Sequence, residues 1–433
     1  MILTALMSKK VLGSSAFPIA DQALVSGANF LTVIFIARAL GPGAFGVYSL
    51  AWFVVLFFAG IQFALISAPM MSIGPKQDEG IRPAYFGVVF LQQAIFAAGT
   101  FVIVAAAVAT SAIFAPQWGV GELTIPIALS AAAYQAKDFL RRYFFLLGRR
   151  SAALSVDITS YCGQVGIVAW LFVSGSLTAS SALWAVVATS SAAILVGGLL
   201  VQRLTWSELP FREVTRRHWR FARWLAADAV LQFSAGYLYV IVAGAALGPT
   251  AVGALRAAQN LMGVNQVIAL GLQNVLPAKA SWHFHHQGAA GLLSYIQSVA
   301  LTGGTVTIVV GIAIGATPEF WLGLVFGDAY VGFGGLVRWF AVIYVLVFVQ
   351  VILQAALKAV EHTVPIFVAA VLSAFVALVS AFPLIHAFGV TGAAMGFLLV
   401  LIVSISALSL GLLRWLRGLA GGRHVKASVG IRP

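Results

Sequence analysis

Long apolar runs recur along the whole chain and are separated by short polar connections. A run of about 20 apolar residues forms a helix that crosses the hydrocarbon core of a bilayer, and a β-barrel would show short alternating segments instead. The pattern predicts an all-α integral membrane protein with about twelve transmembrane helices. The predicted spans are residues 15–38, 44–68, 84–110, 122–147, 151–173, 180–202, 222–246, 251–276, 290–315, 333–357, 363–385 and 391–413.

A short element occurs once in each half of this pattern. Leu40-Gly41-Pro42, followed by Gly46, is matched in the second half by Leu247-Gly248-Pro249, followed by Gly253. A repeated half is typical of secondary transporters. Since each half holds six predicted spans, an even number, both halves enter the membrane from the same side. The sequence therefore predicts two parallel six-helix repeats.

Composition and charge agree with a membrane protein and fix its expected orientation. Hydrophobic residues make up 61% of the chain and charged residues only 9%, against roughly 25% charged residues in soluble domains. The lysines and arginines outside helix ends lie in alternate connections and in both tails, so the positive-inside rule places both termini in the cytoplasm. The net charge of +13 then reflects membrane orientation, and we expect no nucleic-acid partner. Cys162 is the single cysteine, which excludes a disulfide framework.

The connections divide the chain into four expected parts. We expect an N-terminal six-helix lobe over residues 1–205, a basic linker over 206–221, a C-terminal six-helix lobe over 222–415 and a cytoplasmic basic tail over 416–433. Arginines recur along the linker at helical spacing. This pattern indicates an amphipathic helix against anionic lipid, with a regulatory docking site as the alternative. The arginines are Arg212, Arg216, Arg220 and Arg223.

Polar side chains gather on one face of the eighth predicted span, and only Asn265 lies off that face of a straight helix. Such groups usually face a bundle interior or a wet cavity. We favour a cavity wall for an anionic, hydroxyl-rich ligand, with Arg256 as the phosphate partner, because a charge with five amides exceeds what packing needs. Hydrogen bonding between helices is the alternative. The six residues are Arg256, Gln259, Asn260, Gln266, Gln273 and Asn274.

Acidic residues inside three other spans are candidates for a coupling ion or proton. Asp21 shares a face of the first span with Gln22 and Asn29, and the repeat aligns Asp21 with Asp228 in the seventh span. Asp157 lies in the fifth span. These carboxylates are expected to bind a cation or proton, or to balance Arg256. Alternatively, Asp21 and Asp228 lie near the cytoplasmic ends of their spans and cap helices or meet water.

Other polar groups have simpler interpretations. Lys137, Asp138, Arg141 and Arg142 close the fourth span and are read as a cytoplasmic anchor or a lipid-phosphate contact. The segment from Trp282 to His286 is histidine-rich but has no nearby acid or cysteine, so we expect an interfacial loop and no metal site. No catalytic or nucleotide-binding motif is found. We therefore expect neither an enzyme nor a bound cofactor.

The first repeated element also resembles a known family. The stretch Ile36–Leu50, which contains Leu40-Gly41-Pro42, is similar to the junction of the first two helices in bacterial polysaccharide transporters. These are the Wzx-like O-antigen and exopolysaccharide flippases of the multidrug/oligosaccharidyl-lipid/polysaccharide (MOP) superfamily. Leu247-Gly248-Pro249 resembles the equivalent junction of their second lobe, and the stretch Val325–Tyr330 resembles their outer motif before the tenth helix.

The resemblance implies a V-shaped, MATE-like fold of two lobes that alternates access across the bacterial inner membrane. The implied substrate is an undecaprenyl pyrophosphate-linked oligosaccharide, with membrane lipids and other polysaccharide assembly proteins as partners. Arg256 lies where the family carries a cationic cavity residue. Coupling to a proton or sodium gradient is also implied. Only one arginine is clearly mid-membrane, which argues against the peptidoglycan precursor as substrate.

Two other functions are weighed against this one. A multidrug or organic-cation antiporter of the same superfamily would share the fold but would prefer acids and aromatic residues in its cavity. An arginine such as Arg256 would repel a cationic drug. A membrane-embedded polysaccharide polymerase would generally need a sizeable extramembrane region, whereas the longest connection here is the linker near residues 203–221.

Overall fold

The computed structural model contains helices and no strand among the residues it describes, which are 9–114, 120–202, 204–205 and 211–420. Within this part of the chain, only the backbone is described for residues 9–23, 268, 270–271, 274–275 and 419–420. The chain divides into two compact units. The first comprises Met1–Phe233, Leu247–Ala257 and Val325–Ala329, and the second comprises Ser234–Ala246, Ala258–Leu324 and Tyr330–Pro433.

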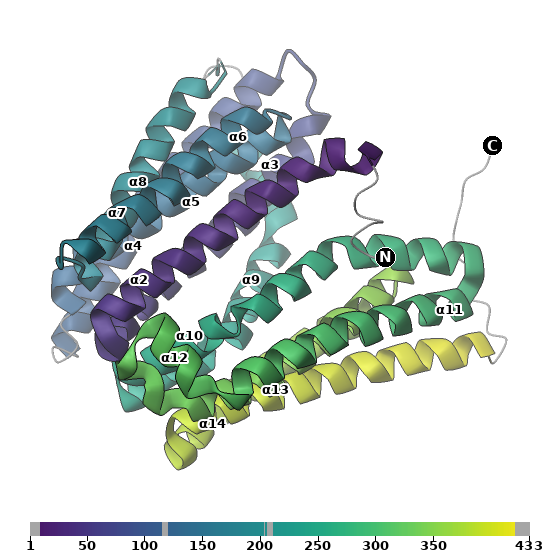
Figure 1. The fold of residues 1–433 in the computed structure, drawn as a ribbon. Helices are drawn as coiled ribbons and strands as arrows, with labels where there is room; N and C mark the ends of the chain where they lie inside the picture. The colour runs from purple at the N-terminus through teal and green to yellow at the C-terminus, as the bar shows by residue number, and fades with distance from the viewer. Residues whose placement is uncertain (1–8, 115–119, 203, 206–210, 421–433) are drawn as a thin grey trace. The chain divides into compact units, whose positions relative to one another are not determined.

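The first unit is a bundle in which α2, α4, α5, α7 and α8 run side by side (Figure 1). Its core is aromatic: Tyr85, Phe86, Phe139, Tyr143 and Phe144 pack together with exposed fractions of 4% or less. The elements are α2 (Lys9–Gln62), the π turn η1 (Phe63–Ser67), α3 (Ala68–Ile73), η2 (Gly74–Lys76), α4 (Arg82–Phe114), η4 (Val120–Leu123), α5 (Thr124–Leu146), α6 (Arg150–Asp157), the π turn η5 (Ile158–Cys162), α7 (Gly163–Val173) and α8 (Ala179–Leu200).

The remaining helices begin with α9 and supply most of the second unit, while the first part of α9 and most of α10 belong to the first unit. Within that unit α13 packs against both α11 and α14 (Figure 1), and Phe348 and Ile352 of α13 bury against Leu276 of α11. The elements are α9 (Phe211–Leu247), α10 (Pro249–Leu261), α11 (Gly263–Ala316), α12 (Pro318–Phe326), η6 (Asp328–Phe333), α13 (Gly334–Ala359) and α14 (Val364–Ala420).

The expected all-α membrane architecture is confirmed. Among the described residues, eight segments are long and apolar enough to cross a membrane. Two of them, Leu24–Lys76 and Val364–Gly418, are divided by Gly41 and Gly389, whose positive φ values interrupt the helices, so each holds two predicted spans. The other two predicted spans correspond to α5 and to α10 with the start of α11, which are more polar. The chain is a multi-pass helical membrane protein.

The repeated element turns the chain at the same position in both copies. Gly41 has a φ of 67° and Gly248 a φ of 89°, a region that side chains other than that of glycine rarely enter. The proline that follows each glycine suits the start of the next helix, because its fixed φ is helical and its missing N–H has no partner to lose there. The Gly-Pro pair therefore ends one helix and begins the next.

The two copies of this element also pack against each other within the first unit. A Cβ placed on Gly46 would overlap the carbonyl group of Pro249, and a Cβ placed on Gly253 would overlap the carbonyl group of Pro42. The contact is reciprocal: each copy offers a glycine to the backbone of the other. Only glycine allows such a close approach of two backbones.

The start of α9 covers part of the first unit. The predicted linker, 206–221, is described only from Phe211 onward, where it forms the first turns of α9 rather than a separate element. Val214 and His218 are buried, whereas the linker arginines are exposed. His218 lies 2.9 Å from the Tyr85 hydroxyl, and Gln92 donates to Thr215 Oγ1 at 2.9 Å. These contacts hold the helix against α4.

The histidine-rich segment is helical, so the expected loop is wrong. Trp282, His283 and His286 lie within α11, and the Trp282 and His286 rings stack at 4.4 Å. Pro277 lies inside this helix without ending it, and the helical backbone is first interrupted at Gly288, which has a φ of 66°. Among the described residues, no group of three metal-ligating side chains is close enough to hold an ion.

Candidate functional site

Arg256 is the cationic residue of the predicted cavity, and it belongs to the first unit. It lies on α10, is half-buried, and places its guanidinium carbon 5.2 Å from the centre of the Phe53 ring. Phe53 itself is 2% exposed. An aromatic face stabilises a cation that has lost part of its water. Arg256 therefore lies in a partly apolar setting beside an aromatic face, and its role as a phosphate partner stays a prediction.

The other predicted side chains of this stripe belong to the second unit. Gln259 and Asn260 are half-buried near the end of α10, and Asn260 Nδ2 is buried without a hydrogen bond. Gln266 and Gln273 are exposed on α11. The Tyr344 hydroxyl lies 3.2 Å from Gln266 Oε1 and 3.4 Å from the Gln259 carbonyl oxygen. The stripe thus offers amide groups, one of them without a partner.

One assumption behind the stripe is wrong. The eighth span is not a single straight helix, because α10 ends at Leu261 and α11 begins at Gly263, with Met262 in a turn conformation between them. The side chains after Met262 are therefore not in the register that an ideal helix predicts. Asn265, which lies off the ideal stripe, is buried, and both polar atoms of its amide are without a hydrogen bond.

Three predicted residues have side chains outside the described part of the chain. These are Asn274 in α11 and Asp21 and Gln22 in α2. Asn29, which shares their predicted face on α2, is half-buried. The role of these four residues stays a prediction.

Asp157 lies inside the first unit and is paired. It is fully buried at the end of α6, and its Oδ2 accepts a hydrogen bond from Arg141 Nε at 2.7 Å. Arg141 comes from α5, so the pair joins two helices. The ion pair that the structure gives Asp157 is with Arg141 and not with the expected Arg256, and its role in binding a coupling cation or proton stays a prediction. A buried carboxylate needs such a partner, because an isolated charge there is very costly.

Lys137 is the residue that sequence reasoning missed. The sequence predicts that it is part of a cytoplasmic anchor or a lipid-phosphate contact, but it is 0% exposed. Its ammonium lies 4.0 Å from the centre of the Tyr161 ring and 4.4 Å from that of Tyr134, and makes no hydrogen bond. The two rings form an aromatic cage that stabilises the cation. Next to it on α5, Asp138 pairs with Arg142 at 2.6 Å.

Asp228, the counterpart of Asp21 in the repeat, has a neutral partner. Gln232, one turn later on α9, donates to its Oδ2 at 3.3 Å. Among the described side chains of the spans, the acids Asp138, Asp157 and Asp228 thus each have a hydrogen-bond partner. An organic cation would have to compete with these partners for a carboxylate.

Comparison with known proteins identifies the fold. No family model matches the chain, and no curated protein sequence does. Among solved structures, the chain is similar to an inward-facing multidrug resistance MATE family transporter of the MOP superfamily, with a TM-score of 0.70 and 16% identity over 94% of this chain and 96% of that one. It is also similar to the lipid II flippase MurJ in an inward closed conformation, with a TM-score of 0.69 and 10% identity over 91% and 87%.

A third structure extends this likeness. A MOP superfamily transporter from Pyrococcus furiosus has a TM-score of 0.59 and 14% identity, with 93% of each chain covered. The chain therefore has the fold of MOP superfamily transporters, as the sequence predicted. The assignment to the Wzx-like polysaccharide transporters within that superfamily stays a proposal.

Proposed function

We propose that this protein is a flippase that moves a lipid pyrophosphate-linked oligosaccharide across the bacterial inner membrane, for O-antigen or exopolysaccharide synthesis. A charged, hydroxyl-rich head group cannot cross about 30 Å of hydrocarbon unaided, because desolvating its polar groups costs too much free energy. A protein that carries it needs a cation for the pyrophosphate, amides for the sugars and an open path for the lipid tail. The undecaprenyl chain would remain in the bilayer.

The observation that carries this proposal is the environment of Arg256. The residue is half-buried beside the Phe53 ring, so its guanidinium is partly shielded from water. A guanidinium binds phosphate oxygens through two parallel hydrogen bonds, and partial burial strengthens them. In the second unit, the amides of Gln259, Asn260 and Gln266 are of the kind that would bind sugar hydroxyls. The likeness in fold to a lipid II flippase is consistent with such cargo.

The remaining parts of the proposal follow from charge placement and from the superfamily resemblance. We place both termini in the cytoplasm, because the basic connections alternate along the chain. Coupling to a proton or sodium gradient is proposed for Asp21 and Asp228, with Asp157 as a third candidate that would first have to leave Arg141. Other polysaccharide assembly proteins are proposed partners, since they would supply and consume the carried glycan.

Organic-cation export is the second candidate, and the likeness to a multidrug MATE transporter favours it. Its weakness is electrostatic. A cationic drug would be repelled by Arg256 and would find the described span carboxylates already partnered. This candidate therefore predicts that removing the charge of Arg256 improves transport, whereas the flippase predicts that transport is lost.

The deciding experiment is a deletion strain in which surface polysaccharide and the pool of lipid-linked oligosaccharide are both measured. Complementation uses the intact protein, Arg256→Ala and Arg256→Lys, with Arg338→Ala as the matched control. Arg338 is an arginine at 54% exposure that already pairs with Glu319 at 2.9 Å. Membrane levels of all variants are compared on immunoblots.

The flippase predicts loss of surface glycan and accumulation of the lipid-linked intermediate in the deletion strain. The intact protein and Arg338→Ala should restore both, Arg256→Ala should not, and Arg256→Lys should restore them in part because lysine keeps the charge but loses bidentate geometry. Unchanged glycan together with altered sensitivity to cationic compounds would overturn the flippase and support the exporter.

A further inference from the structure

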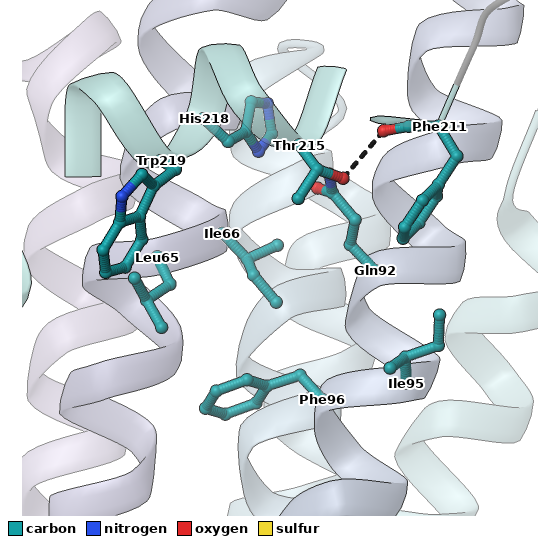
Figure 2. Close-up of a pocket in the computed structure, with 9 residues that line it drawn as sticks. All are labelled: Leu65, Ile66, Gln92, Ile95, Phe96, Phe211, Thr215, His218 and Trp219. Carbon is teal, nitrogen blue, oxygen red and sulfur yellow. Dashed lines mark hydrogen bonds between the residues drawn. The ribbon is translucent and has the colours of Figure 1, made fainter. Parts of the chain in front are cut away.

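An apolar crevice of about 230 Å³ opens beside the start of α9 in the first unit. One wall is α9, which contributes Phe211, Thr215, His218 and Trp219. Figure 2 shows these side chains along one side of the helix, above the opposite wall. Because the four positions follow helical spacing, they form a continuous stripe.

The opposite wall is formed by the π turn η1 and by α4. Leu65 and Ile66 come from η1, and Gln92, Ile95 and Phe96 come from α4 (Figure 2). The Gln92 amide is engaged by Thr215 at 2.9 Å, which leaves hydrocarbon as the main lining. Ile95 is 55% exposed and Trp219 is 57% exposed. Such exposed apolar walls would normally be covered, and a hydrocarbon chain is chemically suited to cover them.

On α9, an arginine comes directly after three of the four residues that line the crevice. Arg212, Arg216 and Arg220 come directly after Phe211, Thr215 and Trp219 in the sequence, so they lie about 100° further round the helix. All three arginines are exposed. The stretch from residue 211 to 223 holds two further arginines and a single acid, Glu213. A cationic stripe thus runs alongside the apolar one.

We infer that this crevice binds an anionic phospholipid, with one acyl chain between α9 and α4 and the phosphate on the arginine stripe. An acyl chain in the crevice would cover the apolar side chains that line it, which otherwise face water or poorly packed lipid. Each arginine near an anionic head group strengthens binding by about fivefold. Trp219 has the amphipathic ring that prefers the level of the head groups. The lipid would fasten α9 to α4, alongside the contact between His218 and Tyr85.

The test is photo-crosslinking of the purified full-length protein with phosphatidylglycerol that carries a diazirine in its acyl chain. Phosphatidylcholine with the same chains is the control lipid, and labelled peptides are mapped by mass spectrometry. The variant is the triple substitution Arg212→Gln, Arg216→Gln and Arg220→Gln. Arg414→Gln with Arg417→Gln is the matched control, because these arginines are also exposed and basic but lie on α14.

The inference predicts that phosphatidylglycerol labels the α4 and α9 walls in preference to phosphatidylcholine. The phosphatidylglycerol concentration that gives half-maximal labelling should rise roughly a hundredfold in the triple variant and change little in the control variant. Equal labelling by both lipids would overturn the inference, since any lipid tail would then suffice. So would the absence of label from these walls. Displacement by a polyprenyl pyrophosphate at lower concentration than by unlabelled phosphatidylglycerol would assign the crevice to a transported lipid instead, and would also overturn it. Because no step requires transport, this result is independent of the proposed function.

Discussion

Arg141 donates a hydrogen bond from Nε to the fully buried carboxylate of Asp157 at 2.7 Å, and this pair joins α5 to the end of α6. The same stretch of α5 carries a second pair of almost equal length, Arg142 with Asp138 at 2.6 Å. The two pairs differ in burial and in sequence separation. Comparing the two pairs therefore shows how much more a buried pair between helices stabilises the protein than a more exposed pair within one helix.

Asp157→Asn should destabilise the protein by roughly 3 kcal/mol, because it leaves a largely buried guanidinium without its counter-charge. Asp138→Asn should cost about 1 kcal/mol or less, since that pair lies within one helix and is more exposed. Thermal unfolding in detergent measures both. Equal losses of melting temperature would show that burial of the Arg141–Asp157 pair does not matter.

Lys137→Met should leave the melting temperature unchanged or raise it, because methionine fills a similar volume and removes a desolvated charge without a hydrogen bond. Lys137→Glu should reduce the yield of folded protein sharply, since a carboxylate would face the electron-rich rings of Tyr134 and Tyr161. The exposed Lys358→Glu serves as the control for charge reversal. The measurement is the folded fraction recovered by size-exclusion chromatography.

Gly46→Ala and Gly253→Ala should each destabilise the protein by roughly 1–3 kcal/mol, the usual cost of overpacking. In each case the new methyl group meets a backbone carbonyl that cannot move like a side chain. Gly43→Ala in the same element is the control, because its Cβ would lie at an ordinary 3.5 Å from Thr250 Oγ1. A control as destabilised as the two variants would contradict the proposed contact.

Gly41→Ala should cost about 1–3 kcal/mol although the site has space for a methyl group. The cost arises from the backbone alone, because Gly41 has a φ of 67° and a ψ of 175°. Gly27→Ala in the same α2 has equally open space and lies in regular helix, so it should be neutral or stabilising. Chemical denaturation of the two variants in detergent separates backbone strain from packing.

The spans and the helix junctions could be predicted from the sequence because their signals are local. Apolar length identifies a span, and Gly-Pro marks the junction between two helices at Pro42 and Pro249. The surroundings of Lys137 could not be predicted in this way. Its cage includes Tyr161 from another helix, and four ionisable residues in close succession look like a helix end.

The eighth span shows a different limit. The polar residues of this span can be identified in the sequence, but the direction in which each side chain points was inferred on the assumption of a straight helix. The turn at Met262 ends that register, and neither neighbour marks it as clearly as a proline would. Arg256 lies before the turn, so its own position on α10 is unaffected. Asn265 lies after it, and its burial was therefore missed.

The contact of Gly46 with Pro249 and of Gly253 with Pro42 has a consequence for the history of this gene. After a duplication, most positions of the two copies can diverge separately, since each serves its own half. The two glycines cannot, because a side chain at either one would strike the backbone of the other copy. This mutual constraint explains why the same short element can still be recognised in both halves of the chain.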